Sequence, residues 1–587
     1  MIVPMKKIAL IMQAKDASSS MMRLRKEGIV HIEHQQPPKS RDLTLLYEEL
    51  GLLNRSIEII SQRTIKEENA FTKEDKKIID FKKTSLHIVD LVKRIDYLEE
   101  YAKELKQKVL DWQLWGDFDP VLIERLKKSN IYIKFYQIPE KELKNISEEI
   151  IVKKISIKSG MVYCLLISKG KNDLPFKEIE LPKTGLNKMK ERLSQDEAEI
   201  NELKKELDKT NCYYQLFLDK RNNLKREIEF QEALNGMGQA QGLVYLVGYA
   251  PVECEQSLLN LAKKEKWGIF LTQPGEEDNP PVLLRNSKWV SLISPVYKLM
   301  EVVPGYRELD VSPIFLLFLA LFFGMIIGDA GYGLVYFILT FFAQRKYSQK
   351  VKGKQVFFLF YLFSSCAIMW GFLSGTFFGQ EWYLASGFKA LTPALNNTKF
   401  LMALCFLLGA IQLSLAHTLQ ALKKLPSLEA LADVGFICLL WVGFLLAKMF
   451  ILEDPFPYFG KWLVWAGVLL IIFFVSPRKN LFRTIGAGLG TLALGIMGNF
   501  GDVVSYIRLF AVGLAGVAVA DSVNMLAAGV GTNIIAKVFI LFIGHSINIV
   551  LGPISVLVHG IRLNVLEFSL LHGNVTWSGL AYKPLRE

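Results

Sequence analysis

The chain has 587 residues, more than one hydrophobic core supports, so at least two domains are expected. Hydrophobic residues make up 51% of it, and its mean hydropathy of +0.24 is high for a soluble protein. The net charge of +12 fits the basic loops of a membrane protein, so no nucleic-acid partner is expected. Lys and Glu are dense before about Leu309 and long apolar runs follow it, which predicts a soluble half and then a membrane half.

Motifs for catalysis or cofactor binding are missing from the sequence. The six cysteines form no C-x-x-C pair and no cluster with His, so no metal site or disulfide framework is predicted. No G-x-x-x-x-G-K-[ST] phosphate loop occurs. Met1–Ala17 lacks the apolar core of a cleavable signal, which predicts that the soluble half stays in the cytoplasm. We therefore expect a protein without catalytic residues, cofactor or metal.

Residues 41–111 and 185–236 carry apolar side chains at alternating spacings of three and four, flanked by Glu and Lys. The stripe includes Leu43, Leu46, Leu50, Leu53, Ile57, Ile88, Leu91, Ile95, Leu98, Leu203, Leu207, Phe217, Leu224 and Ile228. Such a repeat is typical of the a and d positions of a coiled coil. Helices of an ordinary bundle are the alternative, but the sustained repeat favours a long, narrow arm.

Strand-like segments flank these two arms. They lie at 7–12, 29–32, 131–135, 161–167 and 243–249. We predict a cytoplasmic dumbbell over residues 1–310: a proximal α/β lobe (1–40 and 240–300), an antiparallel coiled-coil hairpin made by the two arms, and a distal α/β lobe (112–184). A dumbbell without a nucleotide site suits mechanical attachment to partner helices.

Residues 311–587 are predicted to form an all-α, polytopic transmembrane domain of about eight helices, since one span needs about 20 apolar residues. The first apolar tract is interrupted at Gly328–Gly333. A hairpin of two short helices there, rather than one long helix, keeps the basic loop around Arg345–Lys354 inside and both termini in the cytoplasm. The last two tracts, 484–528 and 534–571, exceed one perpendicular span, which predicts two long tilted helices.

Two arginines, Arg508 and Arg562, lie well inside apolar tracts. A buried guanidinium costs at least about 2.5 kcal/mol on insertion scales, so it needs a purpose or a partner. Its charge is permanent. Either arginine has a structural alternative, by snorkelling or by pairing with Asp502 or Glu567. Mostly small residues share the Arg508 face, which lets another helix approach closely. A fixed cation that meets a carboxylate on a moving partner favours the ionised form of that carboxylate and thus release of its ion.

Further polar residues lie at membrane depth, where such groups often line water-filled paths. The candidates for ion translocation are Arg508, Arg562, Glu567, His559, Asp502, Glu381, Asp329, His417 and Gln412. In the predicted topology, Glu381 and Asp329 lie toward the outer side and Glu567 lies toward the inner side. Two offset aqueous half-paths separated by the arginines fit this pattern, although several of these side chains have interfacial positions as an alternative.

Several motifs, in order along essentially the whole chain, resemble the membrane subunit of V-type and A-type ATPases, called subunit a in eukaryotes and subunit I in prokaryotes. They include Leu114–Pro120, Asn279–Asn286, Pro304–Asp310, Phe323–Gly333, Gly371–Glu381, Ser505–Leu509 and Arg562–Phe568. Arg508 and Arg562 match the two arginines of the family's long tilted helices, and Glu567 matches its acidic residue after the second arginine. Gly516 departs from eukaryotic relatives, which carry a His there.

The resemblance implies a non-catalytic stator subunit of a rotary ATPase. The implied partners are the rotor-ring proteolipid subunits (c/K), the peripheral-stalk E/G subunits, the central-stalk-associated d/C subunit and the lipid bilayer. The compact soluble half looks prokaryotic, which implies a multi-pass protein of the plasma membrane.

Two other functions remain open from the residues alone. A stand-alone secondary ion transporter or channel with a cytoplasmic coiled-coil domain predicts ion flux by this chain by itself. A membrane-anchored scaffold without an ion path leaves Arg508 unexplained. The sequence does not distinguish H⁺ from Na⁺, or pumping from ATP synthesis.

Overall fold

A computed structural model describes residues 1–62, 80–139, 151–158, 160–169, 176, 178–240, 242–348, 353–380, 392–477, 481–573 and 575–586. These residues form two compact units. One unit comprises Met1–Gln13, Glu27–Glu33 and Tyr245–Leu585, and the other comprises Ala14–Lys26, His34–Val244 and the last two residues. Each unit is described by itself.

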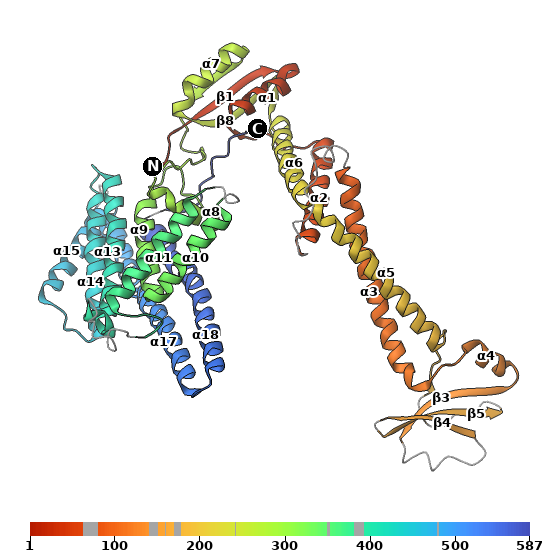
Figure 1. Cartoon of the computed structure of the whole chain (residues 1–587). Coiled ribbons are helices and arrows are strands. Elements are labelled where there is room, and N and C mark those ends of the chain that lie inside the picture. The colour runs from red at the N-terminus through yellow and green to blue at the C-terminus, as the bar shows by residue number, and fades with distance from the viewer. Residues whose placement is uncertain are drawn as a thin grey trace. The chain divides into compact units, whose positions relative to one another are not determined.

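The second unit contains long helices that lie side by side in pairs (Figure 1). It holds α1 (Ala17–Glu27), α2 (Arg41–Ser61), α3 (Phe81–Trp112), α4 (Pro120–Lys128), α5 (Leu186–Lys209) and α6 (Tyr214–Asn235). Helix α2 packs along α6, and α3 packs along α5. The predicted stripe is buried between them: Ile88, Leu207 and Phe217 are 0% exposed. These helices confirm the two predicted helical tracts, while their winding as a coiled coil stays a prediction.

A four-stranded antiparallel sheet follows α4 in this unit. Its order is β4 (Ile151–Lys158), β5 (Met161–Lys169), β3 (Ile131–Pro139) and β6 (Glu178–Ile179). The strands predicted at 131–135 and 161–167 are therefore confirmed, and they pair with each other in register from Ile131↔Lys169 to Pro139↔Met161. Aromatic side chains at the end of α3 pack on this sheet, because Trp112 and Trp115 both contact Phe135 edge-on.

The first unit contains a second sheet built from segments distant in the sequence. Its strand order is β2 (His31–Glu33), β8 (Leu243–Pro251), β1 (Met5–Gln13) and β9 (Gly268–Thr272), and a short strand, β7 (Gly238–Ala240), precedes β8. Helix α7 (Glu255–Glu265) connects β8 to β9. The strands predicted at 7–12, 29–32 and 243–249 correspond to β1, β2 and β8. Each predicted end lies within two residues of the observed end.

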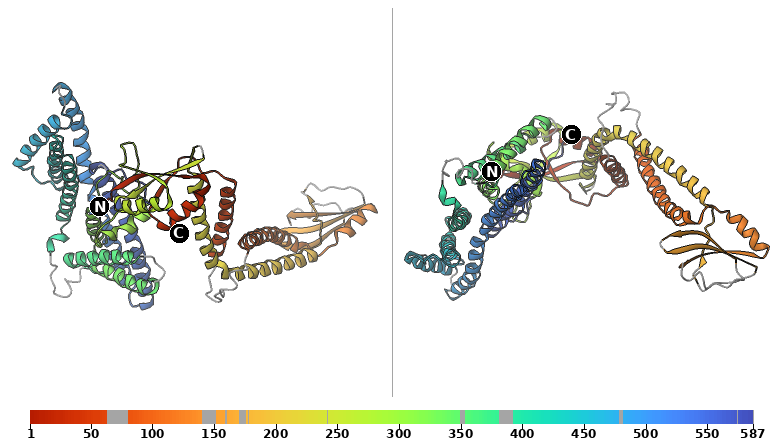
Figure 2. Two further views of the ribbon diagram at one scale, coloured as in Figure 1. Left: turned by 90° about the horizontal axis from the view of Figure 1, so that it is seen from above. Right: turned by 60° about the horizontal axis from the view of Figure 1, so that its bottom comes forward.

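The rest of the first unit is helical. It holds α8 (Ser294–Met300), α9 (Ser312–Ile327), α10 (Ala330–Tyr347), α11 (Gln355–Ser374), α13 (Thr398–Lys424), α14 (Ala430–Leu452), α15 (Tyr458–Phe474), α16 (Leu481–Ser505), α17 (Ile507–Gly529) and α18 (Ile534–Ser555). Two π-helical segments, Val556–Gly560 and Leu563–His572, continue α18. Helices α17 and α18 lie side by side (Figure 2).

Five tracts of the described residues are long and apolar enough to cross a membrane: Gln355–Ser374, Thr398–Lys424, Ala430–Leu452, Phe482–Gly529 and Ile534–His572. Helices α9 and α15 are apolar but shorter. The last two tracts have 48 and 39 residues, far beyond the ~20 of a perpendicular span. The predicted count of about eight spans and the tilt of the last two stay predictions.

The first apolar tract is two helices rather than one. Helix α9 ends at Ile327, Gly328 adopts φ 65°, and Asp329 begins α10 as its N-cap. A positive φ favours glycine, which explains the break at this position. Both helices flank α11, since Phe323 stacks on Phe363 and Phe337 packs on Tyr361. The break between two helices, which was predicted from the basic loop around Arg345–Lys354, is therefore present.

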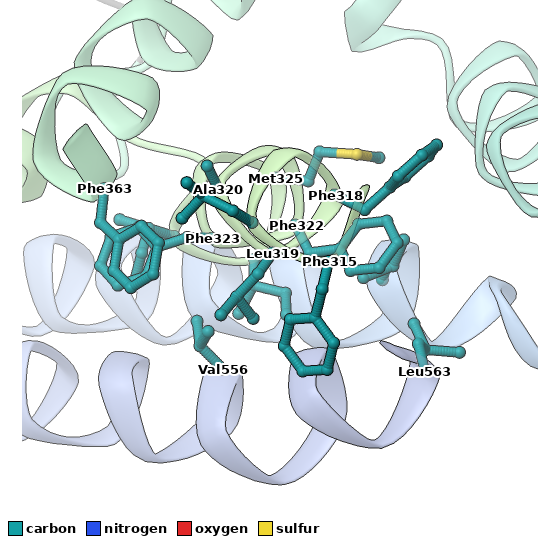
Figure 3. Packing of buried hydrophobic residues seen from close by; sticks show 14 of the residues in the cluster. Phe315, Phe318, Leu319, Ala320, Phe322, Phe323, Met325, Phe363, Val556 and Leu563 are labelled. Atoms are coloured by element: carbon teal, nitrogen blue, oxygen red, sulfur yellow. The ribbon is translucent and has the colours of Figure 1, made fainter. Parts of the chain in front are cut away.

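The core of the helical region surrounds α9. Figure 3 shows Phe315, Leu319 and Phe322 of α9 beside Val556 and Leu563 of the last helix. All five side chains are at least 96% buried. This packing fixes the π-helical part of the last helix against α9, and with it the backbone that carries Arg562.

The segment after His572 returns to the proximal sheet. Ser578 and Ala581 form parallel bridges with Val303 and Val282, and the Leu585 amide donates to the Val30 carbonyl. Thr576 donates from both its amide and its hydroxyl to Glu308. The segment that follows the last helix thus contacts residues 282–308, between the sheet and α9, and Val30, which directly precedes β2.

Candidate functional site

The two arginines of the apolar tracts both contact one carboxylate. Arg508 Nη1 and Arg562 Nε each lie 3.7 Å from Glu567 Oε1. This distance permits an ion pair but exceeds that of a good hydrogen bond. Arg508 Nη1 and Glu567 Oε2 are buried and have no hydrogen-bond partner among the described residues. The cluster therefore keeps unused hydrogen-bonding capacity on both the cation and the anion.

Two guanidinium groups and one carboxylate leave one positive charge when Glu567 is ionised. The Glu567 side chain is 5% exposed, that of Arg508 is 22% exposed, and that of Arg562 is 54% exposed. The carboxylate is thus on the inner side of the cluster, and the guanidinium groups extend outward from it. Glu567 alone therefore does not neutralise both arginines.

Irregular helix geometry surrounds both arginines. Helix α16 ends at Ser505 and α17 begins at Ile507, so Arg508 is in the first turn after a break. Pro553, inside α18, lacks an N–H and disturbs the helical hydrogen bonds that lead into the π-helical segments on each side of Arg562. π-Helical turns are frequent at functional sites.

A first chain of polar side chains connects the two arginine-bearing helices through α13. The Tyr506 hydroxyl donates to Gln412 Oε1 at 2.8 Å, and Gln412 Nε2 donates to Asn564 Oδ1 at 3.0 Å. Asn564 Nδ2 then donates to the Gly560 carbonyl at 3.0 Å. Tyr506, Gln412 and Asn564 are each 0% exposed. We call these three residues the buried brace.

A second chain contains titratable groups and reaches the cytoplasmic end of α13 in the predicted topology. Lys424 Nζ lies 2.8 Å from Asp433 Oδ2, and Asp433 Oδ1 lies 3.2 Å from His417 Nδ1. His417 Nε2 is 2.9 Å from His572 Nδ1, and His572 Nε2 is 3.0 Å from Asp502 Oδ2. We call these five residues the histidine relay. Its Lys424 end is 35% exposed and its three middle residues are buried.

A cavity of about 360 Å³ lies between α9, α10, α17 and α18. Its polar lining comes from Tyr332, Tyr336, Asn548, Ser555 and His559. The Asn548 amide donates to the Tyr332 hydroxyl at 3.1 Å and to the Gly516 carbonyl at 2.9 Å. The cavity begins one turn or more after Arg508 along α17 and is large enough for several water molecules.

The predicted site residues divide into several groups. Arg508, Arg562 and Glu567 come together. His417 and Asp502 belong to the histidine relay, Gln412 belongs to the buried brace, and His559 lines the cavity. Asp329 accepts from the amides of Gly331, Tyr332 and Gly379, which makes it a helix cap at 1% exposure. Glu381 lies outside the described residues.

Sequence reasoning did not select His572, Tyr506 or Asn564. In an α-helix, residues five apart point about 140° away from each other, so His572 and Glu567 did not share a predicted face. A π-helix bonds residue i to i+5 and places them closer together. Pro553 was the available signal for this irregularity. Among the described residues, no group of three or more His, Cys, Asp or Glu side chains is arranged to hold a metal ion.

Comparisons with known proteins identify the family. No protein-family model matches the chain. V-type ATP synthase subunit I of Borreliella burgdorferi is 30% identical over 622 aligned positions, which cover 100% of both chains. The chain belongs to the V-type ATP synthase subunit I family. V-type ATP synthase subunit I 1 of Treponema pallidum is 29% identical, also over 100% of both chains. The predicted resemblance is thus confirmed, and with its five apolar tracts this family member is a membrane protein.

Other family members are more distant. A-type ATP synthase subunit I of Methanocaldococcus jannaschii is 25% identical over 80% of this chain and 71% of its own length. Among solved structures, the cytoplasmic N-terminal domain of subunit I, a homolog of subunit a of V-ATPase, matches 46% of this chain and 100% of its own. Its identity of 13% and TM-score of 0.21 are too low for a comparison of the folds.

Proposed function

We propose that the chain is a non-catalytic stator subunit of a rotary V/A-type ATPase and that its arginines act on carboxylates of the rotor ring. The observation that carries this proposal is the pair of guanidinium groups that share one carboxylate in the membrane domain. Names of the full-length relatives support a place in an ATP synthase complex. The absence of a phosphate loop from the sequence agrees with ATP hydrolysis by other subunits.

Arg508 is the residue we assign to the rotor contact. Its charge does not titrate, so a rotor carboxylate that reaches it is held ionised and releases its ion. The exposed positions that follow along α17 include the small Ala511, Ala515 and Ala518, together with the larger Leu514 and Val519. Small side chains allow a neighbouring helix to approach closely within a membrane. Arg562 adds a second positive charge beside the same carboxylate and prevents the cluster from becoming neutral.

Two separate polar paths reach this cluster from opposite directions. The histidine relay approaches Asp502 from the Lys424 end of α13, and we assign it to the cytoplasmic half-path. The cavity beside His559 and Asn548 extends along α17 away from Arg508, and we assign it to the outer half-path. Because neither path crosses the arginines, an ion must leave one path on a rotor carboxylate and enter the other after rotation. The transported ion is H⁺ or Na⁺.

The cytoplasmic unit is proposed to anchor the stator. Its paired helices and distal sheet offer surfaces for the peripheral-stalk E/G subunits, and the central-stalk-associated d/C subunit is a further partner. The proximal sheet, which shares a compact unit with the membrane helices, transmits the holding force to them. The rotor-ring c/K subunits face the arginines. We place the protein in a prokaryotic plasma membrane with both termini in the cytoplasm.

The test is reconstitution of the assembled complex with Arg508→Ala in liposomes. We expect ATP hydrolysis to lose its coupling and ATP-driven ion uptake to fall to background, because no fixed charge discharges the rotor. Arg508→Lys serves as the comparison that keeps a positive charge at this position but loses the planar guanidinium group. Uptake at the normal rate by Arg508→Ala refutes the assigned role. Ion flux through the isolated chain, without a rotor, would instead support the stand-alone transporter.

A further inference from the structure

The buried brace connects the two arginine-bearing helices at equivalent distances from their arginines. Tyr506 lies two residues before Arg508, and Asn564 lies two residues after Arg562. Residues two apart on a helix do not face the same side. In agreement, Tyr506 and Asn564 are 0% exposed, whereas Arg562 is 54% exposed. The brace residues point into the core, whereas the neighbouring arginines are more exposed, Arg508 at 22% and Arg562 at 54%.

We propose that Gln412 is a positioning residue that holds Arg508 and Arg562 at a fixed separation, an inference that rests on the function proposed above. Its amide is the only group of the brace that contacts both helices. One end accepts from Tyr506, and the other end donates to Asn564. A shift of either helix along its axis lengthens one of these hydrogen bonds.

The brace has one satisfied arrangement. Tyr506 donates, Gln412 accepts and donates, and Asn564 accepts from Gln412 while its own amide donates to Gly560. Rotation of the Gln412 amide would place its NH₂ against the Tyr506 hydroxyl and its oxygen against the Asn564 oxygen. Two acceptors would then face each other in a buried site, at a cost of about 1–3 kcal/mol. The brace therefore specifies one register of the helices.

A close backbone approach makes this arrangement possible. Gly409 lies one turn before Gln412 on α13, and a Cβ at that position would lie 2.7 Å from the Tyr506 ring. The ring consequently packs against the α13 backbone, and its hydroxyl reaches the Gln412 oxygen. Both polar ends of Gln412 are occupied and its side chain is 0% exposed, so it is not a group that carries ions through water.

Three variants of the complete complex test this positioning role. Gln412→Met keeps the size of the side chain and removes both hydrogen bonds. The triple variant Tyr506→Phe, Gln412→Met, Asn564→Leu removes all three polar side chains of the brace, so that none of them is left unsatisfied and only the Gly560 carbonyl loses a donor, which favours folding over the single change. Ser414→Ala is the matched control, because Ser414 is on the same helix and its hydroxyl has no hydrogen-bond partner among the described residues.

The measurement is the number of ions transported per ATP hydrolysed in liposomes, with the yield of assembled complex determined in parallel. We expect Ser414→Ala to equal the unmodified complex. Both Gln412→Met and the triple variant should lose about tenfold in ions per ATP, because misplacements of about 1 Å cost up to ~10²-fold in catalysis. If the complex with Gln412→Met does not assemble, the triple variant tests the positioning role in its place.

Normal ions per ATP in the triple variant would overturn the proposal, because the brace would then only satisfy buried polar groups. Normal coupling in Gln412→Met would overturn it as well. Arg508→Ala, measured in the same experiment, distinguishes a failure of the proposed stator function from a failure of the positioning role of Gln412. If the complex with Arg508→Ala pumps normally, the proposed stator function is refuted. If that complex does not pump and the brace variants pump normally, only the proposed positioning role is refuted.

Discussion

The long helices of the second unit and the membrane-domain helices of the first unit differ in what their buried polar side chains contact. Between α2, α3, α5 and α6 the buried seam is mainly apolar. Its buried Ser56 donates only to backbone carbonyls, those of Leu52 and of Ser85 on α3, and Asp196 pairs with Arg192 on its own helix. In the membrane domain the buried polar groups connect distant segments, as His417 contacts His572 and Gln412 contacts Asn564.

This difference predicts that the two regions tolerate substitutions differently. An apolar seam distributes its stability over many similar contacts, so each residue is replaceable by another of similar shape. A polar chain depends on each donor and acceptor, because one missing member leaves buried groups unpaired. We therefore expect α2, α3, α5 and α6 to tolerate conservative substitutions. The buried brace and the histidine relay should be sensitive to them.

The largest effect is expected in the histidine relay. His417→Leu and His572→Leu interrupt it at its centre and should each reduce ATP-driven ion uptake by about 10²-fold, at the lower end of what a positioned proton-transfer group contributes. Ion uptake by liposomes with the assembled complex measures this. His87→Gln, on the exposed surface of α3, is the control and should leave uptake unchanged. Full ion uptake by both variants would contradict the assignment of the histidine relay to the cytoplasmic half-path.

A smaller effect is expected at the shared carboxylate. Glu567→Gln removes the carboxylate that both guanidinium groups contact. Because Arg562 is half exposed, the loss falls mainly on the partly buried Arg508 pair, at a cost of about 1–3 kcal/mol. The free energy of unfolding of the membrane domain should fall accordingly, as measured by denaturation of the complex in detergent. Unchanged stability would mean that the arginines are solvated or paired by other groups.

The apolar seam should respond to size and not to small changes of shape. Phe217→Ala removes a fully buried ring and is expected to cost about 3 kcal/mol, whereas Ile95→Leu conserves volume and should cost less than about 1.5 kcal/mol. Hydrogen exchange of the amides in α3 and α6 within the full-length chain reports both. Equal losses in the two variants would contradict the interchangeable character of this seam.

The smallest effect is expected at a helix end. The Asp80 side chain accepts from the amides of Lys82 and Lys83 as the N-cap of α3. Asp80→Ala should cost about 1 kcal/mol and raise hydrogen exchange only in the first turn of α3. Asp80→Asn keeps the acceptor and is the control. Increased exchange along the whole helix would show that α3 depends on its cap more than on its seam.

The sequence predicted the features that arise from local periodicity or local backbone preference. Heptad stripes predicted the buried faces of α3 and α6, since side chains three and four apart share a helix face. The interruption at Gly328–Gly333 and the charges of the loops predicted the break between α9 and α10, where the structure has a positive φ at Gly328 and a capping carboxylate at Asp329. The three charges Arg508, Arg562 and Glu567 were identified because isolated charges are rare in apolar tracts.

The remaining features depend on tertiary contacts or on irregular helices. The pairing of Asp433 with His417 joins two helices whose rotation no single periodicity defines. His572 comes near the other polar residues through a π-helical segment, which a count of 3.6 residues per turn does not reproduce. Gln412 was predicted for ion translocation on its polarity alone, and its occupied amide became visible only with both partner helices in place.

The central claim is that a permanent positive charge faces a passing rotor carboxylate. Electron cryo-microscopy of the assembled complex tests it most directly, through the surroundings of Arg508. We predict that a rotor carboxylate lies within contact distance of the Arg508 guanidinium and that Glu567 stays shared between both arginines. Guanidinium groups that face lipid, with the rotor ring against another surface of the chain, would contradict the account.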